Sequence, residues 1–249
     1  MRYFAEISYD GSAFHGWQIQ PNAFSVQEEI QTKMERILQT PVSVTGCGRT
    51  DTGVHATQFF LHFDSELELD HEFVYSFNQV LVSEVAVHGL WVCPENVHAR
   101  FDAKSRSYRY KLHSRKSPFL RNQSYYFRPE LDVNAMNEGA EIIAGHTHFD
   151  AFCKSNTDNK TDICRIDHCQ WVSEGSRMEF EVTADRFLRN MVRAMVGTLL
   201  LVGQGKLSLE QLKTILESRK RSNAGESVPA HALFLEKVVY DQTTWRKVG

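Results

Sequence analysis

The residues best able to do chemistry stand together between Gly46 and Ala56, where the chain reads Gly-Cys-Gly-Arg-Thr-Asp-Thr-Gly-Val-His-Ala. Glycines in such a segment permit positive φ angles or a close approach of the backbone to a ligand. Arg49 and Asp51, two residues apart, bring a cation and a carboxylate to one small region. A polar turn between two strands can have a similar composition. The segment therefore predicts either such a turn or a site built around Asp51.

The tripeptide Asp51-Thr52-Gly53 also opens the catalytic loop of aspartic proteases, which use two carboxylates that share one proton. The sequence contains no second Asp-Thr-Gly or Asp-Ser-Gly, so only a second copy of the chain could complete the pair. A nearby guanidinium such as that of Arg49 favours the ionised carboxylate, whereas a shared proton requires one carboxyl group to stay protonated. A protease is therefore the weaker interpretation.

A longer string is far more specific. Gly48-Arg49-Thr50-Asp51-x-Gly53-Val54-His55-Ala56 closely resembles the motif of the TruA family of tRNA pseudouridine synthases, in which the Asp is the essential catalytic residue. Further blocks of this family stand on both sides in the family's order. They are Tyr9-Asp10-Gly11-Ser12, Gly16-Trp17-Gln18 and Ser25-Val26-Gln27 before it, and His98-Ala99-Arg100-Phe101, Tyr108-Arg109-Tyr110, Phe187-Leu188-x-x-Met191-Val192-Arg193 and Val196-Gly197 after it. The resemblance covers essentially the whole chain.

The resemblance implies an isomerase that converts uridine to pseudouridine at positions 38 to 40 in the anticodon stem-loop of tRNA, with no cofactor and no metal. Asp51 is then the catalytic carboxylate, and Arg193 is the cation that keeps it ionised in a closed site. Tyr108 would stack on the target uracil and could take part in proton transfer. Arg49 would help to extrude the target nucleotide from its stem. Weaker candidates for contacts to the RNA backbone, each of which could equally be solvated, are His55, Arg100, Arg109, Lys111 and Arg189.

Two of these roles have plain alternatives when the residues are taken alone. Tyr108 lies on an alternating strand and reads equally well as a core residue, while Arg193 reads as an arginine on a helix surface. A non-catalytic RNA-binding protein on the same fold is the alternative function. Such a protein would keep the basic residues but could lose Asp51, Tyr108 or Arg193, and all three are present. The resemblance also implies a homodimer.

The elements that must position these residues follow from hydrophobic periodicity, caps and turn residues. The first half predicts a strand at 3–9, a helix capped by Ser25 that ends before Pro41, strands at 42–45 and 58–63, a helix at 70–82 and a strand at 85–93. The second half predicts a strand at 106–113, a helix at 132–144, strands at 166–173 and 177–184, a helix at 187–202 and a strand at 233–240. An added helix at 208–219 opens with a capping box of Ser208 and Gln211.

Each half thus reads βαββαβ, the order of the ferredoxin-like unit. We therefore expect an α+β protein of two ferredoxin-like lobes with antiparallel sheets. The N-terminal lobe, 1–102, carries the Asp51 loop, and the C-terminal lobe, 103–249, carries Tyr108 and Arg193. The resemblance implies that the two lobes face a central basic cleft.

The formal net charge of −3 is unusual for a protein that binds RNA, but the charges are unevenly distributed. Residues 61–99 contain seven acidic residues and no Lys or Arg, whereas residues 100–128 contain nine Lys or Arg and the single acid Asp102. Segregation of this kind can give an acidic protein a basic face, although a solvated strand has the same pattern. The sequence therefore remains compatible with a nucleic-acid partner.

Composition predicts a globular, cytoplasmic protein without a membrane span, since no apolar run approaches eighteen residues and no basic segment precedes a signal-peptide core. The five cysteines include no C-x-x-C pair, which favours reduced thiols over a disulfide framework. Six Cys and His residues between 146 and 169 are of the types that bind zinc, but their spacing in the sequence is irregular, so we interpret them as ordinary buried or surface residues. They are His146, His148, Cys153, Cys164, His168 and Cys169.

Overall fold

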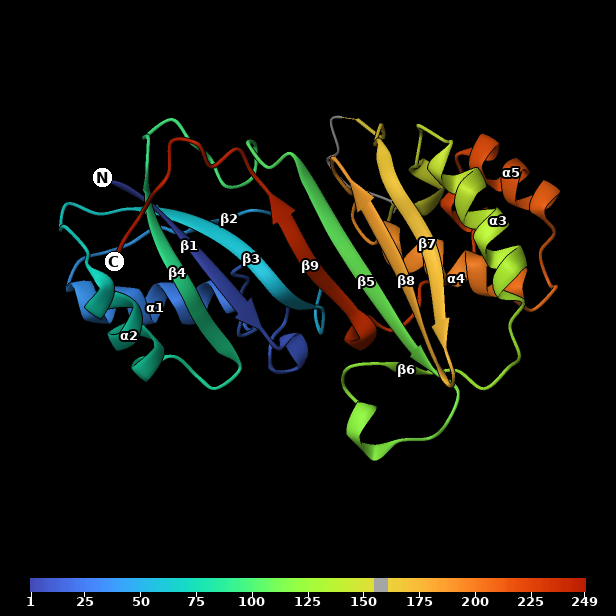
Figure 1. The fold of residues 1–249 in the computed structure, drawn as a ribbon, viewed down its shortest axis with the longest axis horizontal. Coiled ribbons are helices and arrows are strands. Elements are labelled where there is room, and N and C mark those ends of the chain that lie inside the picture. Colours follow the sequence, from blue (N-terminus) through green and yellow to red (C-terminus); the bar gives the residue numbers. More distant parts are fainter. Residues whose placement is uncertain (155–160) are drawn as a thin grey trace. The chain divides into compact units, whose positions relative to one another are not determined.

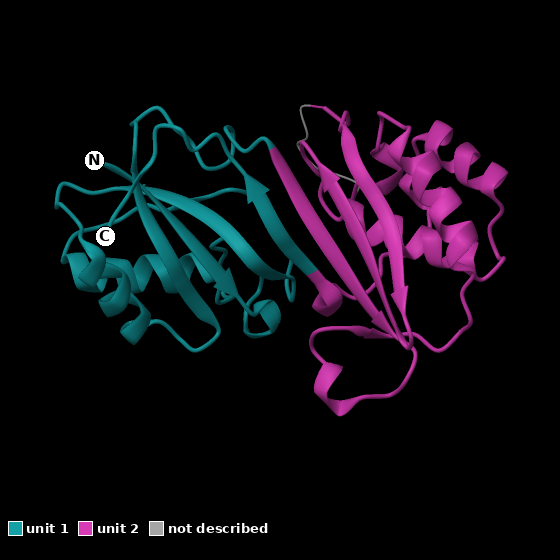
Figure 2. Ribbon diagram, viewed as in Figure 1, with its two compact units in different colours: residues 1–104, 234–249 teal, residues 105–233 magenta. Residues whose placement is uncertain are grey.

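The structure is a computed structural model that describes residues 1–154 and 161–249 (Figure 1). It divides into two compact units: unit 1 contains residues 1–104 and 234–249, and unit 2 contains residues 105–233 (Figure 2). This division differs from the expected lobes, 1–102 and 103–249, chiefly at the C-terminal end. Residues 234–249 belong to unit 1 because the last long strand pairs with a strand of that unit.

Unit 1 begins with the predicted βαββαβ order: β1 (Arg2–Tyr9), α1 (Val26–Leu38), β2 (Thr45–Gly46), β3 (His55–Asp64), α2 (His71–Val80) and β4 (Val85–Cys93). Its sheet runs β10-β4-β1-β3-β9, and β2 pairs with β3. The added strands are β9 (Leu233–Val239) and β10 (Arg246–Lys247). All pairs in this sheet are antiparallel except β3 with β9, which is parallel. The expectation of a purely antiparallel sheet is therefore wrong at β9.

Local chemistry explains the limits of α1 and β2. The hydroxyl oxygen of Ser25 accepts the backbone N–H of Glu28 at 3.2 Å, which confirms the predicted N-cap of α1. The predicted strand at 42–45 is wrong in extent, because only its last residue pairs with β3. Side chains of α1 bind the backbone of the remainder: Val42 N donates to Glu35 Oε1 at 3.2 Å, and Val44 O accepts Gln27 Nε2 at 2.9 Å.

Unit 2 contains β5 (Ser105–His113), β6 (Tyr125–Tyr126), α3 (Val133–Ala144), β7 (Ile166–Glu174), β8 (Arg177–Ala184), α4 (Met191–Gly203) and α5 (Leu209–Ser218). Its sheet has the order β5-β8-β7 with antiparallel pairs, and the short β6 runs parallel to β5. Helix α3 packs against β7, α4 and α5. The predicted capping box of Ser208 and Gln211 is confirmed at the start of α5.

Helix α4 begins at Met191, four residues after its predicted start at 187. The residue before it, Asn190, has a φ of 67° in the left-handed region, which ends any helical run from the N-terminal side. The α+β class is confirmed. Among the described residues, no helix is long and apolar enough to cross a membrane.

Candidate active site

Asp51 lies in the loop between β2 and β3, and the residue before it is held from three directions. The Thr50 side-chain oxygen lies 2.9 Å from the Tyr9 hydroxyl in a buried contact, and Thr50 O accepts the N–H of Trp17 at 3.2 Å. Gly16, at a φ of 88°, lies so close that a Cβ there would be 2.5 Å from Thr50 O. The chain entering Asp51 is therefore fixed by β1 and by the Gly16-Trp17 segment.

The chain leaving Asp51 turns sharply and is also enclosed. Val54 N donates to Asp51 O at 3.1 Å, and Gly53 in this turn has a φ of 78°. A Cβ on Gly11 would lie 2.0 Å from Val54 O, so only glycine permits this approach of the two backbones. The loop is thus clamped on both sides of Asp51, whose side chain is half-buried. It is a built structure rather than a loose polar turn.

His55, the first residue of β3, is buried behind this loop. Its Nδ1 accepts the N–H of Gly11 at 3.1 Å and lies 3.1 Å from Asp10 Oδ1, while its ring stacks on Phe234 with centroids 4.5 Å apart. Burial acts to raise the pKa of Asp10, but hydrogen bonds from Ser12 and the nearby His55 outweigh it and lower that pKa. With only 2% of its surface exposed, His55 supports the loop, and this burial argues against its expected contact with RNA.

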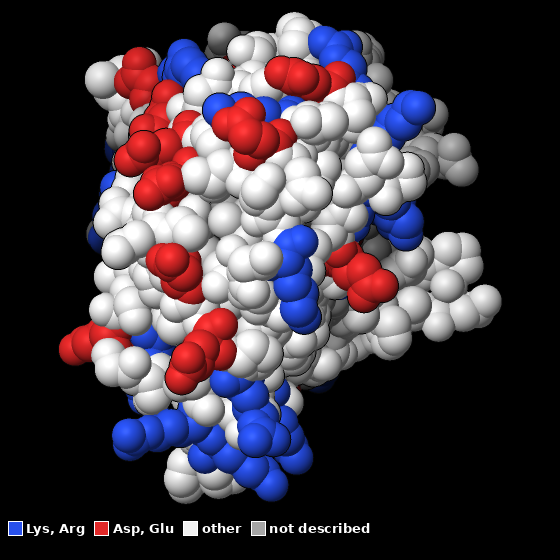
Figure 3. Space-filling view, turned by 90° about the vertical axis from the view of Figure 1, so that its right-hand side faces the viewer, with Lys and Arg blue, Asp and Glu red and all other residues white. Residues whose placement is uncertain are grey.

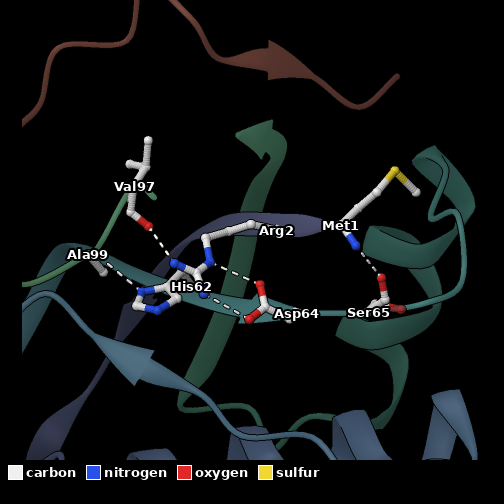
Figure 4. A network of polar contacts seen from close by, with 7 residues as sticks. All are labelled: Met1, Arg2, His62, Asp64, Ser65, Val97 and Ala99. Atoms are coloured by element: carbon white, nitrogen blue, oxygen red, sulfur yellow. Dashed lines mark hydrogen bonds and ion pairs between the residues drawn. The ribbon is translucent and has the colours of Figure 1, made fainter. Parts of the chain in front are cut away.

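The turn after β4 that contains the His98-Ala99-Arg100-Phe101 block is tied to β1 and β3 (Figure 4). Arg2 donates twice to Asp64, at 2.9 and 2.8 Å, and once to Val97 O at 3.0 Å. Ala99 N donates to His62 Nδ1 at 3.1 Å. Burial, helped by the charge of Arg2, lowers the pKa of His62 to about 4, so its ring is neutral at pH 7 and can accept this bond.

Tyr108 lies on β5 in unit 2, half-buried, with its ring edge-to-face with Phe187 at 5.0 Å. Two residues further, Tyr110 is fully buried and its hydroxyl donates to Pro229 O at 2.8 Å. Burial strongly raises the pKa of Tyr110, so this hydroxyl stays protonated. Tyr110 is therefore the core tyrosine of this strand, and Tyr108 is the more accessible of the two.

Arg193 lies in the first turn of α4, half-buried, where residues 225–228 cross the helix. Its Nε donates to Val228 O at 2.7 Å, and Val228 N donates to Arg193 O at 3.3 Å. The crossing is close because Gly197 has no side chain: a Cβ there would lie 1.8 Å from Glu226 O. The segment therefore orients the guanidinium of Arg193, which makes it more than a helix-surface arginine.

The remaining predicted contacts differ in their surroundings. Arg109 is engaged in ion pairs with Glu179 and Glu181 of β8, at 3.3 and 3.2 Å, so its charge is largely offset. Arg100 lies 5.7 Å above the centre of the Phe101 ring. Arg49, Arg100 and Arg189 are exposed, and Lys111 is half-buried on β5.

The structure thus groups the predicted residues by unit. The loop of unit 1 brings together Arg49, Asp51 and His55, whereas Tyr108 and Arg193 belong to unit 2. Sequence reasoning missed the residues that clamp the loop, Tyr9 and Gly16, although both stand in the motif blocks before it. Their presence in those blocks was the signal.

The cysteine and histidine segment at 146–169 has ordinary contacts where it is described. His148 Nδ1 lies 2.6 Å from Asp162 Oδ2, and burial raises the pKa of Cys164 to about 12. Residues 155–160, inside this segment, are outside the described part of the chain. Within the described part, no three His, Cys, Asp or Glu side chains are grouped so that they could hold a metal ion.

Known proteins resemble this chain along its length. The sequence profile of a family described as tRNA pseudouridine synthase matches residues 140–241. A protein named tRNA pseudouridine synthase A from Parabacteroides distasonis is 44% identical over 97% of this chain and 96% of its own length. A protein of the same name from Bacteroides fragilis is 45% identical over 97% of this chain and 97% of its own length. Another, from Bacillus subtilis, is 36% identical over 97% of this chain and its entire own length. The similarity includes both units and the Asp51 loop.

Proposed function

This chain belongs to the tRNA pseudouridine synthase A family, and from that premise we propose that it isomerises uridine to pseudouridine at positions 38 to 40 in the anticodon stem-loop of tRNA. The reaction breaks the N1–C1′ bond of uridine, turns the detached uracil over and joins C5 to C1′. The proton on C5 is lost and N1 gains one, so there is no redox change and no net water. The enzyme must supply a carboxylate, a contact that holds the detached base, and a charge that keeps the carboxylate ionised.

Asp51 is the proposed carboxylate, and it acts either by attacking the sugar carbon or by removing a sugar proton on a glycal path. The support is the clamp around it. Tyr9, Gly16 and Gly11 fix the backbone on both sides of Asp51, and such close support is what a catalytic group held in one geometry requires. This clamp is the observation that carries the assignment.

The other roles belong to side chains whose surroundings suit them. Arg193 is proposed as the cation that pairs with the Asp51 carboxylate, and its bond to Val228 O would hold the guanidinium ready. Tyr108 is proposed to stack on the target uracil, since its ring is half-buried and packs edge-on against Phe187. Arg49, exposed in the loop, is proposed to help extrude the nucleotide.

The two units are proposed to be ferredoxin-like lobes. Unit 1 has the strand order β4-β1-β3-β2 with two helical crossovers, which suits that fold. Unit 2 repeats the first five elements of the order, with β5-β8-β7 as its sheet. The basic cleft and the homodimer stay predictions that rest on the resemblance, and the cytoplasmic location stays a prediction that rests on composition.

The test incubates the protein with an unmodified tRNA transcript and maps pseudouridine by carbodiimide-induced stops of reverse transcription. We expect stops at positions 38 to 40 with the wild type and none with Asp51→Asn, which keeps the shape of the side chain but lacks the carboxylate. Asp167→Asn, at an exposed aspartate of β7 that pairs with Arg165, is the matched control and should leave the stops unchanged.

Each failure has a distinct meaning. Turnover by Asp51→Asn within about tenfold of the wild type would show that Asp51 is not the essential carboxylate. Stops at other positions would refute the target site but leave the reaction. A wild-type protein that binds the tRNA and yields no stops would be the non-catalytic RNA-binding protein.

A further inference from the structure

Unit 2 carries a basic projection that contains none of the residues proposed above for the active site. We call it the basic arm and define it as residues 114–128, from the end of β5 through β6 to Arg128. It contains no acidic residue, and its cations are all exposed: Arg115, Lys116, Arg121 and Arg128. The arm extends below the sheet of unit 2 in Figure 1. Figure 3, turned by 90° about the vertical axis, shows Lys and Arg gathered at the lower end of the side that it presents.

An aromatic side chain stands among these charges. Phe119 lies in the short helical turn Pro118–Leu120 and is 90% exposed, more than any other large hydrophobic residue of the described chain. Tyr126, on β6, is 40% exposed. A phenylalanine left almost entirely in water between cations is poorly explained by packing within the unit, because it buries little of its ring there.

The arm is nevertheless a fixed structure. Gln123 N and Ser124 N both donate to Leu120 O, at 3.1 and 3.0 Å, and close the turn that directly follows Phe119. The ring of His113 is bonded to the buried Ser124 hydroxyl at 2.9 Å. At its base, Ser114 N donates to Ser176 O at 2.9 Å, and β6 pairs with the end of β5. The backbone therefore presents Phe119 outward in one conformation.

The charges of the arm also differ from those of the neighbouring strand. Arg109 on β5 is paired with two glutamates, whereas within the described residues no carboxylate lies within ion-pair distance of Arg115, Lys116 or Arg121. Cations of this kind can neutralise an external anion without first breaking an internal pair. The arm, rather than the face of β5 that carries Arg109, therefore offers cations that, in the described part of the chain, are not already held in an internal ion pair.

We propose that the basic arm is a second tRNA contact, in which its cations bind the phosphate backbone and Phe119 stacks on an unpaired nucleobase. Exposed rings between cations are the combination by which proteins hold single-stranded nucleic acid. The proposal rests on the proposed function, which makes tRNA the substrate. A lipid surface or a second copy of the chain could also meet a basic loop with an aromatic tip, and the test separates these.

The experiment measures the affinity of an unmodified tRNA transcript over a series of salt concentrations. Phe119→Ala should weaken binding on the order of tenfold, and Phe119→Trp should restore it, because only a ring can stack. The triple variant Arg115→Gln/Lys116→Gln/Arg121→Gln should reduce the slope of log K against log salt by about 2 to 3, as expected for three lost phosphate contacts.

The matched control is Lys206→Gln/Lys213→Gln/Lys220→Gln, which removes the same charge from three exposed residues of unit 2 outside the arm. It should bind like the wild type. The proposal is overturned if Phe119→Ala retains wild-type affinity, or if the arm and control triple variants have the same salt slope. The proposal is also overturned if the arm variants keep their tRNA affinity but lose binding to anionic lipid vesicles or lose self-association. The partner of the arm would then be a lipid surface or a second copy of the chain.

Pseudouridine formation by the wild type in the same tRNA tests the proposed function separately. If the wild type is active and Asp51→Asn is not, but the arm variants bind normally, the arm proposal alone fails. If the wild type is inactive while the arm variants lose tRNA affinity, the proposed function alone fails.

Discussion

Replacing Gly16 with alanine tests whether the backbone before Asp51 has to lie where it does. The new Cβ would be 2.5 Å from Thr50 O, and ordinary contact begins at 3.4 Å, so the two groups must separate by about 0.9 Å. The residue that moves is next to Asp51. A misplacement of about 1 Å at a catalytic group can cost on the order of 100-fold in rate, or about 2.7 kcal/mol of transition-state stabilisation.

Gly16 also has a φ of 88°, which disfavours any side chain by about 1 to 2 kcal/mol, and this cost has to be separated from the clash. Gly205 provides the control. Its φ is 67°, but a Cβ there would meet nothing within 4 Å. Gly205→Ala should therefore lose stability through its φ alone and keep its activity, while Gly16→Ala should lose both.

The assay is the single-turnover release of tritium from tRNA that carries 5-tritiated uridine, at saturating enzyme, together with thermal unfolding of each variant. We expect Gly16→Ala to react about 100-fold more slowly than Gly205→Ala, with tRNA affinity within about threefold. Equal rates for the two folded variants would refute the argument that the clamp positions Asp51.

Three further outcomes follow from the contacts of the site. Tyr9→Phe removes the buried hydroxyl contact to Thr50, so it should lower the free energy of unfolding by about 1 kcal/mol and also lower the reaction rate. If urea unfolding shows that the variant is folded and its rate is unchanged, the contact contributes to stability alone. Arg193→Lys keeps the charge but loses the Nε bond to Val228 O, so its activity in the tritium assay should fall. Activity close to that of the wild type would contradict the need for an oriented guanidinium. The folded-state pKa of His62 is about 4 against an ordinary 6.5, so the unfolded chain takes up this proton first as pH falls. Stability from this group is therefore complete above pH 6.5 and declines as the pH falls towards 4. His62→Asn keeps an acceptor for Ala99 N without the titration, so denaturant unfolding from pH 4 to 7 should show a flatter curve, and parallel curves would contradict the prediction.

Local patterns predicted most elements because they depend on neighbouring residues. The predicted strands at 85–93 and 177–184 agree with β4 and β8 residue for residue, and the Ser208 capping box placed the start of α5. Such local patterns could not predict contacts between segments that are distant in the sequence. The short β2 depends on side chains of α1 that bind the backbone at Val42 and Val44, and no pattern inside 42–45 reveals them.

The candidate site was predictable in its motif but not in its support. The sequence motif around Asp51 identified the loop as a candidate site. The contacts of Tyr9 and Gly16 with Thr50 depend on how β1 and the turn after it pack against this loop, which the motif does not reveal. Arg109 shows the opposite case. The nearest charged residues in its sequence, Arg106 and Lys111, are basic. Only the register of β5 with β8, which sets Arg109 opposite Glu181, reveals that its charge is offset.

The parallel pairing of β9 with β3 has a consequence for how the protein is made. His55 pairs with Phe234 and stacks on its ring, and Thr57 bonds to Leu235, which lies 178 residues further along the chain. A ribosome that has produced the Asp51 loop must therefore add most of the remaining sequence before the strand beside that loop exists. Contacts between such distant residues also form slowly. A nascent chain released before Leu233 would carry Asp51, Tyr108 and Arg193 but leave His55 uncovered, so we expect it to be inactive although no proposed catalytic residue is missing.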